Sequence, residues 1–540
     1  MTKAVPLPPT SLVLRRFTSC ERLRAYPAKS KYFARRPGNP TESYRYTPND
    51  HSRIELSCVT SPGEPLAANP EDVDVPLVVD VDGTLVTTDL LVEGSLRLLA
   101  SSPWRLLVSA VEGLRGRAAF KRAVTKAVPL PPTSLVLHPA VVEEVETARR
   151  SGRPVWLASG ADALAVEPLA KHLEADGFLA SDGERNLVGK AKAEALVERF
   201  GEGRFDYIGN DRKDLPVWRR ARRAVSVGAS AGLARKVRNL HPEAKSIAGL
   251  GTAVDYLKAL RPHQCAKNAL VFVAPAAAHA VEVGTYLGAA GAFVALSLIA
   301  SSGYIFNDMV DIGHDREHPS KRYRPLAAGR VRLVPLAGAG VLLAVAGIGA
   351  SFLLSTGLGV CALLYLALTV TYSLWLKRLI VIDVIVLASL YVVRVVAGGA
   401  AVGVPVSPWL LAFSMFVFLA LAVVKRRKEL ANLAERRQRA IHGRGYVAED
   451  ASAMTMLGAA SAVGAVIVLA MYVQAPEVAK RYGRPELLWL ACPLFLYWLG
   501  RLLLLAQRGA VDDDPVMFAL RDRASWVTGL LLVIVAVMAL

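Results

Sequence analysis

The chain has 540 residues, 53% of them hydrophobic, and a formal net charge of +18. Apolar runs near 20 residues long, the length that crosses a bilayer as a helix, dominate beyond about residue 265. These properties exclude a wholly soluble protein and predict a soluble first half joined to a membrane-spanning second half. The positive charge would suit nucleic acid, but the Lys and Arg residues stand between apolar segments, as in membrane proteins. We therefore expect a membrane, and no nucleic acid, as the partner.

Residues 1–70 are rich in Arg, Pro, Ser and Tyr and lack sustained periodicity, so we expect a disordered extension. Within it, residues 2–14 (TKAVPLPPTSLVL) recur without a mismatch at 125–137. A structural repeat would normally have diverged and would extend further. We interpret this repeat as a recent duplication or an artefact, with the second copy inside a domain and the first without a role in the fold.

An α/β domain is predicted over residues 71–250, because strand-like and helix-like segments alternate there. The strand-like runs are 75–79, 153–159 and 204–210, and the helical patterns are 139–151, 163–175 and 190–200. Alternation of this kind predicts a parallel sheet with helices on both faces, which is a Rossmannoid architecture.

The first strand runs into V-V-D-V-D-G-T-L-V (78–86). This D-x-D-G-T motif resembles the first motif of haloacid-dehalogenase-type (HAD) phosphatases. The resemblance implies that Asp80 is the nucleophile and that Asp82 is the general acid and base. That chemistry needs one carboxylate that forms an acyl-phosphate and a second that protonates the leaving oxygen.

Two later residues fit the same resemblance. Ser159 ends the second strand and fits the phosphate-binding position. Lys192, favoured over Lys190 by its spacing before A-E-A-L, fits the lysine that offsets negative charge. Both side chains are therefore implied to bind the phosphate substrate.

The segment G-N-D-R-K-D-L (209–215) fits the metal motif of the HAD family. The resemblance implies a Mg²⁺ ion held by Asp80, Asp82 and Asp214. Asn210 departs from the family, which usually has Asp there, so a weakened or rearranged Mg²⁺ site is expected. The alternative is a degenerate HAD fold that serves as a scaffold.

Residues 255–540 are predicted to form an all-α, polytopic membrane domain. Nine candidate spans follow from the apolar runs, the first of them short: 268–280, 285–306, 333–352, 356–376, 380–400, 408–424, 453–474, 485–506 and 525–540.

Lys and Arg residues of this region gather in the loops 307–332 and 425–452. Several alternate loops have none: 281–284, 353–355 and 401–407. With nine spans the basic loops share the cytoplasmic side, except for the basic loop 475–484. We therefore expect a multi-pass protein of the inner (plasma) membrane with its N-terminal domain in the cytoplasm.

The loop after the second span begins with four polar residues, Asn307, Asp308, Asp311 and Asp315. Ionisable residues at a membrane edge are functional candidates by default. Their spacing places the three carboxylates on one face of a helix, where they repel one another unless a cation lies among them. Mg²⁺ suits such a site because it shares carboxylate oxygens with substrate phosphates. The three Asp residues are thus predicted metal ligands, and Asn307 adds an oxygen ligand or binds a phosphate.

Lys321, Arg322 and Arg324 follow closely and can neutralise the remaining phosphate oxygens. The alternative is a solvated acidic helix end balanced by a basic loop. That alternative does not explain why Asn and three Asp share one face directly after an apolar span. We therefore expect a Mg²⁺-diphosphate site and a donor substrate that carries a diphosphate.

The pattern N-D-x-x-D-x-x-x-D followed by K-R-x-R-P-L-x-x-G resembles the first Asp-rich motif of the UbiA superfamily of intramembrane prenyltransferases. The resemblance covers about 255–540, assigns catalysis to Asp308 and Asp311, and is closest to the branch that includes decaprenyl-phosphate phosphoribosyltransferase. Cys265 stands where that branch usually has Trp. Supporting segments are R-P-H-Q-C-A-K-N (261–268), Y-S-L-W-L-K-R-L-I-V-I-D-V (372–384), L-Y-V-V-R-V-V-A-G-G-A (390–400), V-K-R-R-K-E-L (424–430) and G-R-G-Y (443–446).

The same resemblance implies roles for residues elsewhere in the membrane domain. Lys377 and Asp383 would form a second polar cluster. Arg394, deep in an apolar span, would face the substrate cavity, with an interhelical ion pair as the alternative. Four later carboxylates are expected to be solvated or to order their loop: Asp512, Asp513, Asp514 and Asp522.

Two reactions use such a diphosphate site. Allylic prenyl diphosphates and phosphoribosyl diphosphate (PRPP) both lose diphosphate, and Mg²⁺ with cationic side chains stabilises that leaving group. The wider segments resemble the phosphoribosyl branch, and 377–400 lacks a second D-x-x-x-D motif. We favour transfer of 5-phosphoribose from PRPP to a polyprenyl phosphate, after which the HAD-like domain removes the 5-phosphate.

The alternative reaction is prenyl transfer from an allylic polyprenyl diphosphate to an aromatic acceptor, with the HAD-like domain as a scaffold. A transporter or a non-enzymatic scaffold is a further alternative, but clear inverted repeats and broken midplane helices are not evident. Association into a homo-oligomer is left open.

Overall fold

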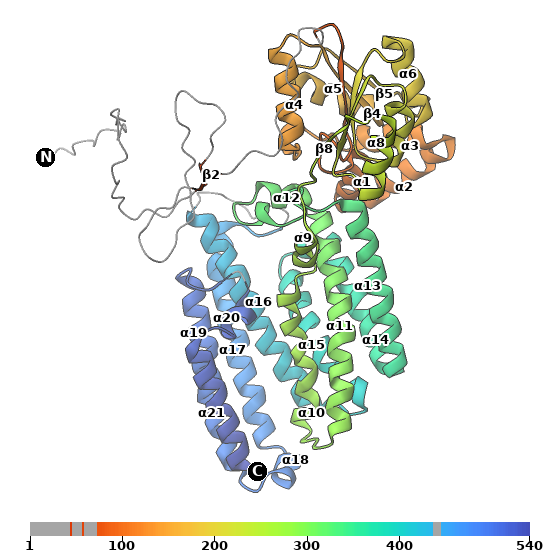
Figure 1. Cartoon of the computed structure of the whole chain (residues 1–540). Coiled ribbons are helices and arrows are strands. Elements are labelled where there is room, and N and C mark those ends of the chain that lie inside the picture. The colour runs from red at the N-terminus through yellow and green to blue at the C-terminus, as the bar shows by residue number, and fades with distance from the viewer. Residues whose placement is uncertain (1–43, 46–56, 59–72, 436–443, 513) are drawn as a thin grey trace, which may run out of the picture. The chain divides into compact units, whose positions relative to one another are not determined.

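The computed structural model describes residues 44–45, 57–58, 73–435, 444–512 and 514–540. The chain divides into two compact units, Met1–Glu64 and Pro65–Leu540. In the first unit, the described residues form an antiparallel pair of strands, β1 (Tyr44–Arg45) and β2 (Ser57–Cys58). The first copy of the repeat and most of the extension expected to be disordered lie outside the described residues. All that follows concerns the second unit (Figure 1).

The α/β part of this unit is built on a six-stranded parallel sheet with the strand order β5-β4-β3-β6-β7-β8. Parallel strands buried on both faces consist of near-continuous apolar runs, as the Leu-Val-Val of β3 does. The predicted parallel sheet is confirmed. Its strands are β3 (Leu77–Asp80), β4 (Val155–Asp162), β5 (Gly177–Ser181), β6 (Asp206–Gly209), β7 (Arg223–Val227) and β8 (Lys245–Ile247).

Helices cover both faces of the sheet. Successive side chains of a strand point to opposite faces, so Val79 packs with Val145 and Leu169 in one core, and Val78 packs with Leu196 in another. The helices are α4 (Pro139–Arg150), α5 (Ala163–His172), α6 (Lys190–Phe200), α7 (Leu215–Trp218) and α8 (Ala231–Leu240).

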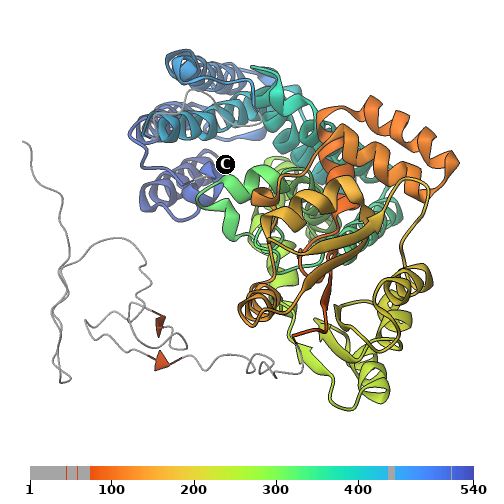
Figure 2. The same cartoon turned by 90° about the horizontal axis from the view of Figure 1, so that it is seen from above.

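Three helices that the sequence patterns did not predict lie between β3 and β4 and pack on one another as a small cap (orange in Figure 2). They are α1 (Leu90–Ser101), α2 (Pro103–Glu112) and α3 (Arg117–Ala127). The second copy of the repeat begins at the end of α3. It continues through the 3-10 turn Pro132–Ser134, and Leu137 pairs with Val86. This copy is therefore part of the fold.

The rest of the unit is helical, and among the described residues seven helices are long and apolar enough to cross a membrane. The expected count of nine is not confirmed. The first expected span, 268–280, is instead a 3-10 helix, Pro262–Phe272, followed by the short α10 (Val273–Ala277), and the last helix, α21 (Arg523–Ala539), is shorter. The seven are α11 (Val283–Val310), α13 (Leu333–Leu354), α14 (Thr356–Leu374), α15 (Ile382–Val402), α16 (Pro408–Glu435), α17 (Ala451–Val473) and α19 (Ala491–Gln507).

Small residues let these helices approach closely, as is usual in membranes. A Cβ atom on Gly347 of α13 would lie 2.8 Å from the carbonyl oxygen of Ala295 on α11. Outward-facing side chains such as Val341 and Leu353 remain 65% and 90% exposed. Apolar exposure of that extent suits a lipid surrounding, so the chain is an integral membrane protein. Short helices complete the fold: α9 (Ala253–Ala259), α12 (Ile312–Glu317), α18 (Pro476–Arg481) and α20 (Pro515–Ala519).

Candidate active sites

The Asp-rich motif lies where α11 ends and α12 begins. Asp308 belongs to the last turn of α11, Asp311 separates the two helices, and Asp315 lies on α12. A single atom, Arg324 Nη1, lies 3.1 Å from Asp308 Oδ1 and 2.6 Å from Asp315 Oδ2. Arg261 also donates to Asp308. One guanidinium nitrogen thus bridges two buried carboxylates, in the position that a cation would take.

Asp311 has a different partner from the other two carboxylates. Lys377 Nζ donates to Asp311 Oδ1. Nearby, Asn307 Oδ1 accepts a hydrogen bond of 3.2 Å from Ser373 Oγ. The structure therefore brings Asp308 and Asp315 together and places Asp311 beside Lys377.

Burial shifts the pKa of two side chains of this cluster, Asp315 and Lys377. It raises the pKa of Asp315, an effect that Arg324 opposes and Asp308 increases. It lowers the pKa of Lys377, and the Asp311 carboxylate opposes that change. The Asp315 and Lys377 side chains thus lie in a poorly solvated region, each beside an oppositely charged neighbour. A divalent cation bound there would rearrange these contacts.

The donor set fits Mg²⁺ bound together with a diphosphate. Within the described ranges, no three His, Cys, Asp or Glu side chains form a cage that would hold a metal by itself. Mg²⁺ commonly binds through one or two carboxylates plus substrate phosphates. The pair Asp308 and Asp315, bridged by a cationic nitrogen, offers that number of carboxylates.

The three predicted basic residues differ in their placement. Arg324 belongs to the cluster, and Lys321 is half-buried and helps to lower the pKa of Asp315. Arg322 is exposed, and its Nη2 atom lies 2.7 Å from the hydroxyl of Tyr323. Arg322 is thus not brought into the cluster.

Asp383 does not share a cluster with Lys377, which corrects the expectation of a second cluster made by these two. Asp383 is fully buried, and its carboxylate accepts hydrogen bonds from Arg426 Nη2 and the Tyr372 hydroxyl, both at 2.8 Å, and from Arg444 Nη1 at 3.2 Å. Two buried guanidinium groups compensate this carboxylate, whereas Lys377 faces Asp311. The sequence showed Arg426 and Arg444 within a basic loop and within segments that support the family resemblance, but gave no sign that they contact Asp383.

Arg394 is buried on α15 without a carboxylate partner among the described residues. Its Nε atom donates to Asn268 Oδ1 at 2.8 Å and its Nη2 atom to the Tyr365 hydroxyl at 2.7 Å. The guanidinium also stacks on the Tyr391 ring, 5.4 Å from the centroid. The alternative of an interhelical ion pair is therefore not found.

Of the late carboxylates, Asp512 is exposed and Asp522 pairs with Arg501 at 2.7 Å, as expected for loop order. Asp514 differs, because it pairs with the buried ammonium of Lys267. Asp513 lies outside the described residues.

The HAD-type residues meet at the carboxyl ends of the sheet strands. Lys192 Nζ lies 2.7 Å from Asp80 Oδ1, and Thr84 Oγ1 donates to Asp80 Oδ2 at 2.9 Å. Ser159 Oγ donates to Asp82 Oδ2 at 3.0 Å. The structure thus brings Asp80, Asp82, Ser159 and Lys192 together.

Burial sets the charges of this second site as well. It raises the pKa of Asp80 to about 7, with Lys192 opposing, and it raises the pKa of Asp82 to about 6, with Asp89 adding to the effect. Burial also acts to lower the pKa of Lys192, but Asp80 and Asp214 raise it above its ordinary value. A carboxyl group of this kind can carry a proton near neutral pH, as a general acid must.

Asp214 organises the metal-motif loop. Its carboxylate accepts from the Tyr207 hydroxyl at 2.8 Å and from the backbone N–H groups of Asn210 and Asp211 at 3.0 Å. The Asn210 side chain lies against Gly83, where an added Cβ would meet Asn210 Nδ2 at 2.3 Å. Asn210 is therefore beside the D-x-D-G-T loop and offers that loop an amide in place of a carboxylate.

Lys121 is a residue near this site that sequence reasoning missed. It comes from α3, and its Nζ atom lies 2.5 Å from Gly160 O and 2.7 Å from Asn186 Oδ1. Burial lowers its pKa, and Asp82 opposes that change. No sequence motif marked it, because the cap helices were not predicted.

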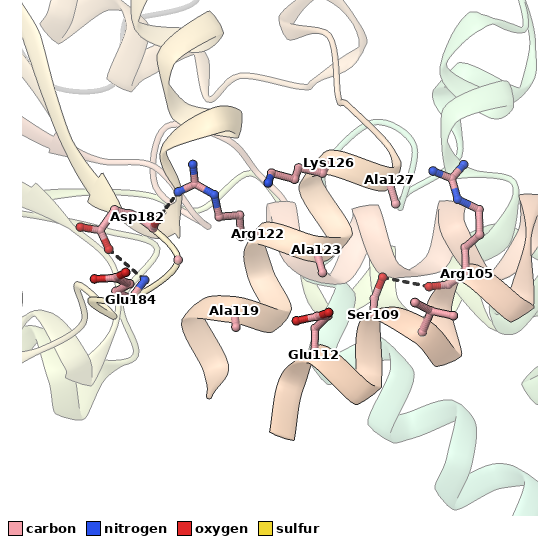
Figure 3. A pocket seen from close by; sticks show the side chains of 12 residues that line it. Arg105, Ser109, Glu112, Ala119, Arg122, Ala123, Lys126, Ala127, Asp182 and Glu184 are labelled. Atoms are coloured by element: carbon pink, nitrogen blue, oxygen red, sulfur yellow. Dashed lines mark hydrogen bonds between the residues drawn. The ribbon is translucent and has the colours of Figure 1, made fainter. Parts of the chain in front are cut away.

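A cavity of about 740 Å³ lies between α2, α3 and the loop after β5 (Figure 3). Arg122 crosses it and donates to the carbonyl oxygen of Asp182. The lining mixes cations with carboxylates and includes none of the residues of the two sites above. Its charged members are Arg105, Glu112, Arg122, Lys126, Asp182 and Glu184.

The α/β domain contacts the Asp-rich region directly. Thr87, near the D-x-D-G-T loop, packs on Gly329, where an added Cβ would lie 2.4 Å from Thr87 Oγ1. Arg332 donates to the carbonyl oxygen of Gly228, and Arg378 donates to that of Ala100. The two sites therefore belong to domains that touch through the loop 307–332 and through the turn Leu376–Arg378.

Comparison with known proteins agrees with this arrangement. A model of the UbiA prenyltransferase family matches residues 269–526, and a model of haloacid dehalogenase-like hydrolases matches residues 77–219. The uncharacterised protein y4nM of Sinorhizobium fredii is 35% identical over 479 residues, which cover 87% of this chain and 92% of that relative.

Decaprenyl-phosphate phosphoribosyltransferase of Mycolicibacterium smegmatis is 33% identical over 279 residues, which cover 49% of this chain and 86% of the relative. A solved UbiA homolog from Archaeoglobus fulgidus, bound to DMAPP and Mg²⁺, is 15% identical with a TM-score of 0.36 and covers 47% of this chain and 97% of its own. The chain belongs to the UbiA prenyltransferase family and carries an N-terminal haloacid dehalogenase-like hydrolase domain.

Proposed function

We propose that this enzyme transfers 5-phosphoribose from PRPP to a polyprenyl phosphate and that its HAD-like domain then removes the 5-phosphate. The observation that carries the transfer step is the Arg324 bridge between Asp308 and Asp315. Asp308 and Asp315 would hold a Mg²⁺ ion that offsets the charge of a diphosphate, and Arg324 could then bind a phosphate oxygen. Relatives named decaprenyl-phosphate phosphoribosyltransferase support PRPP as the donor.

In the transfer step, a phosphate oxygen of the lipid attacks C1 of the ribose. The C1–O bond to the diphosphate breaks, and the diphosphate leaves with the electron pair. Bound Mg²⁺ supplies charge stabilisation on that leaving group. Arg261, Arg324 and Lys377, which contact the motif carboxylates, donate hydrogen bonds to the remaining phosphate oxygens.

The lipid phosphate needs a cation of its own. The partners of Arg394 among the described residues are all neutral: Asn268, the Tyr365 hydroxyl, the carbonyl oxygen of Leu390 and the Tyr391 ring. A buried guanidinium without a carboxylate favours an anionic ligand, because an unpaired buried charge is costly. We assign Arg394 to the lipid substrate, with the polyprenyl tail between the helices.

In the second step, an Asp80 oxygen attacks the phosphorus of the ribose 5-phosphate. The bond from phosphorus to the ribose oxygen breaks, and Asp82 protonates that oxygen. Water then hydrolyses the aspartyl phosphate, with Asp82 as the base. Lys192 and Ser159 hold the transferred phosphate.

The protein lies in the inner membrane of the cell, and both sites face the cytoplasm.

A reconstituted assay tests the proposal. Purified protein in liposomes receives labelled PRPP and polyprenyl phosphate, with and without Mg²⁺, and lipid products are separated. Mg²⁺-dependent label in the lipid is expected. Product only from an allylic diphosphate and an aromatic acceptor would establish the alternative prenyl transfer, with the HAD-like domain as a scaffold.

A further inference from the structure

One helix of the cap, α2, has an apolar face that none of the described residues covers. Trp104, Leu107 and Val111 of α2 and Leu114 of the 3-10 turn Gly113–Arg115, which continues the helix, follow one another at three- and four-residue spacing and are 72%, 59%, 64% and 87% exposed. Residues at these spacings share one face of a helix. Val108 of the same helix is 51% exposed, and outside α2 and the turn that follows it the exposed large apolar side chains between residues 73 and 250 are isolated and none exceeds 41%.

The opposite face of α2 is already used. Ser109 is buried there. Gly113, which follows the helix, lies against Phe120 of α3, because a Cβ atom added to Gly113 would lie 3.4 Å from the Phe120 Cβ atom. The exposed face is therefore not a surface left over from incomplete packing of the cap. It is as exposed as Val341 and Val345, side chains of the span α13 that are 65% and 64% exposed.

The start of α2 is fixed at the level where two membrane spans end. Ala100, in the last turn of α1, packs with Val310 at the end of α11 and with Leu374 at the end of α14. Its carbonyl oxygen accepts a hydrogen bond from Arg378, which lies between α14 and α15. Pro103 begins α2 three residues later. The apolar face of α2 thus starts beside the ends of two candidate membrane spans.

Basic residues accompany this face. Arg105, Arg115 and Arg117 are all exposed, and Glu112 offsets part of their charge through a 3.3 Å contact with Arg115. Helices with an apolar face, Trp and flanking Arg residues lie in the interface of a bilayer, where cationic groups attract anionic headgroups. Tryptophan in particular is enriched at that depth.

We propose that α2 is an interfacial membrane helix, whose face of Trp104, Leu107, Val111 and Leu114 lies in the headgroup and upper acyl region of the bilayer that the spans cross. The occupant of the face is lipid, because the face continues directly from the ends of α11 and α14. This docking fixes the cap at the lipid surface. The adjacent α3 carries Lys121 to the Asp80 site, so that site is held beside the membrane.

Quenching of tryptophan emission by brominated lipid tests the proposal in the full-length protein. Wild type, Trp104→Phe and Trp156→Phe are reconstituted in liposomes of ordinary lipid and of lipid brominated on the upper acyl carbons. Subtraction of each variant from wild type isolates one of the eight tryptophans. Trp156 is the matched control, because it packs on Phe200 within the α/β domain.

The contribution of Trp104 is expected to lose most of its intensity in brominated lipid, and that of Trp156 to stay unchanged. Leu107→Ser with Val111→Ser, at positions outside the protein core, is expected to restore much of the Trp104 emission. A Trp104 contribution that bromine leaves unchanged overturns the proposal. If, in addition, the Trp104 emission changed with the density of protein in the bilayer, a second copy of the chain would be the occupant of this face.

Discussion

Arg316 of the UbiA domain forms an ion pair with Glu93 of the HAD-like domain, with its Nη1 and Nη2 atoms 2.8 and 3.1 Å from Glu93 Oε1 and Oε2. Glu93 is fully buried. Arg316 directly follows Asp315 in the chain. Glu93 lies on α1, whose first residue, Leu90, donates its N–H to Asp82 at 2.9 Å. One helix therefore contacts both the Asp-rich motif and the proposed acid of the phosphatase site.

Glu93→Gln is expected to destabilise the protein and to slow transfer, because it leaves Arg316 and Arg97 without their shared carboxylate. Removal of one partner of a buried pair costs about 3–5 kcal/mol. Thermal unfolding of the detergent-solubilised protein and the rate of lipid labelling measure the two effects. Glu112→Gln is the control, because its pair with Arg115 is exposed. Equal behaviour of the two variants would show that the Glu93 pair has no such role.

Asp308→Asn and Asp315→Asn are each expected to lower transfer by about 10²–10³-fold, the typical loss when one group that stabilises transition-state charge is removed. The rate is measured at saturating PRPP over a range of Mg²⁺ concentrations. Asp512→Asn, at an exposed carboxylate, is expected to retain the wild-type rate. Full activity of both motif variants would exclude these residues as metal ligands.

Asn210→Asp is expected to strengthen Mg²⁺ binding at the HAD-type site, since it adds a carboxylate beside the D-x-D-G-T loop. Ligand charge tunes metal affinity, and a tenfold lower half-saturating Mg²⁺ concentration would correspond to about 1.4 kcal/mol. Hydrolysis of a soluble phosphate ester gives the measurement. Asp211→Asn, at the neighbouring exposed position, should leave the Mg²⁺ dependence unchanged. An unchanged dependence in Asn210→Asp would contradict the assigned place of residue 210.

Gly398→Ala is expected to lower the melting temperature, because its Cβ would lie 1.9 Å from the carbonyl oxygen of Val271. Overpacking of this kind costs about 1–3 kcal/mol or more. Gly349→Ala on α13 is the matched change, since its Cβ meets no atom within 4 Å. A melting temperature that falls equally in both would show that the close approach of α15 to residues 262–272 does not limit stability.

Periodicity was enough to predict the parallel sheet and the long spans, because buried strands and lipid-exposed helices have apolar runs of characteristic length. It failed for the cap. The segment of α1 and α2 combines apolar residues on several sides with Pro103 at the start of α2, so its pattern resembles neither a strand nor a span. It also failed for 262–277, where a 3-10 helix replaces a regular span.

For the HAD-type site, the family resemblance grouped Asp80, Asp82, Ser159 and Lys192, and the structure brings these side chains together, with Lys192 reaching Asp80 from α6. Contacts between distant helices could not be read in this way. The family resemblance placed Lys377 with Asp383, but in the structure Lys377 donates to Asp311 and Asp383 accepts from Arg426.

Mass analysis of the lipid product tests the central claim most directly. Full-length wild type and Asp80→Asn are incubated with PRPP, polyprenyl phosphate and Mg²⁺ in liposomes. The wild type should yield a ribosyl lipid without the 5-phosphate, whereas Asp80→Asn should transfer at the wild-type rate and accumulate the phosphoribosyl lipid. Absence of any ribosyl lipid from either protein would contradict the transfer reaction, and the same product from both would contradict the role of the HAD-like domain.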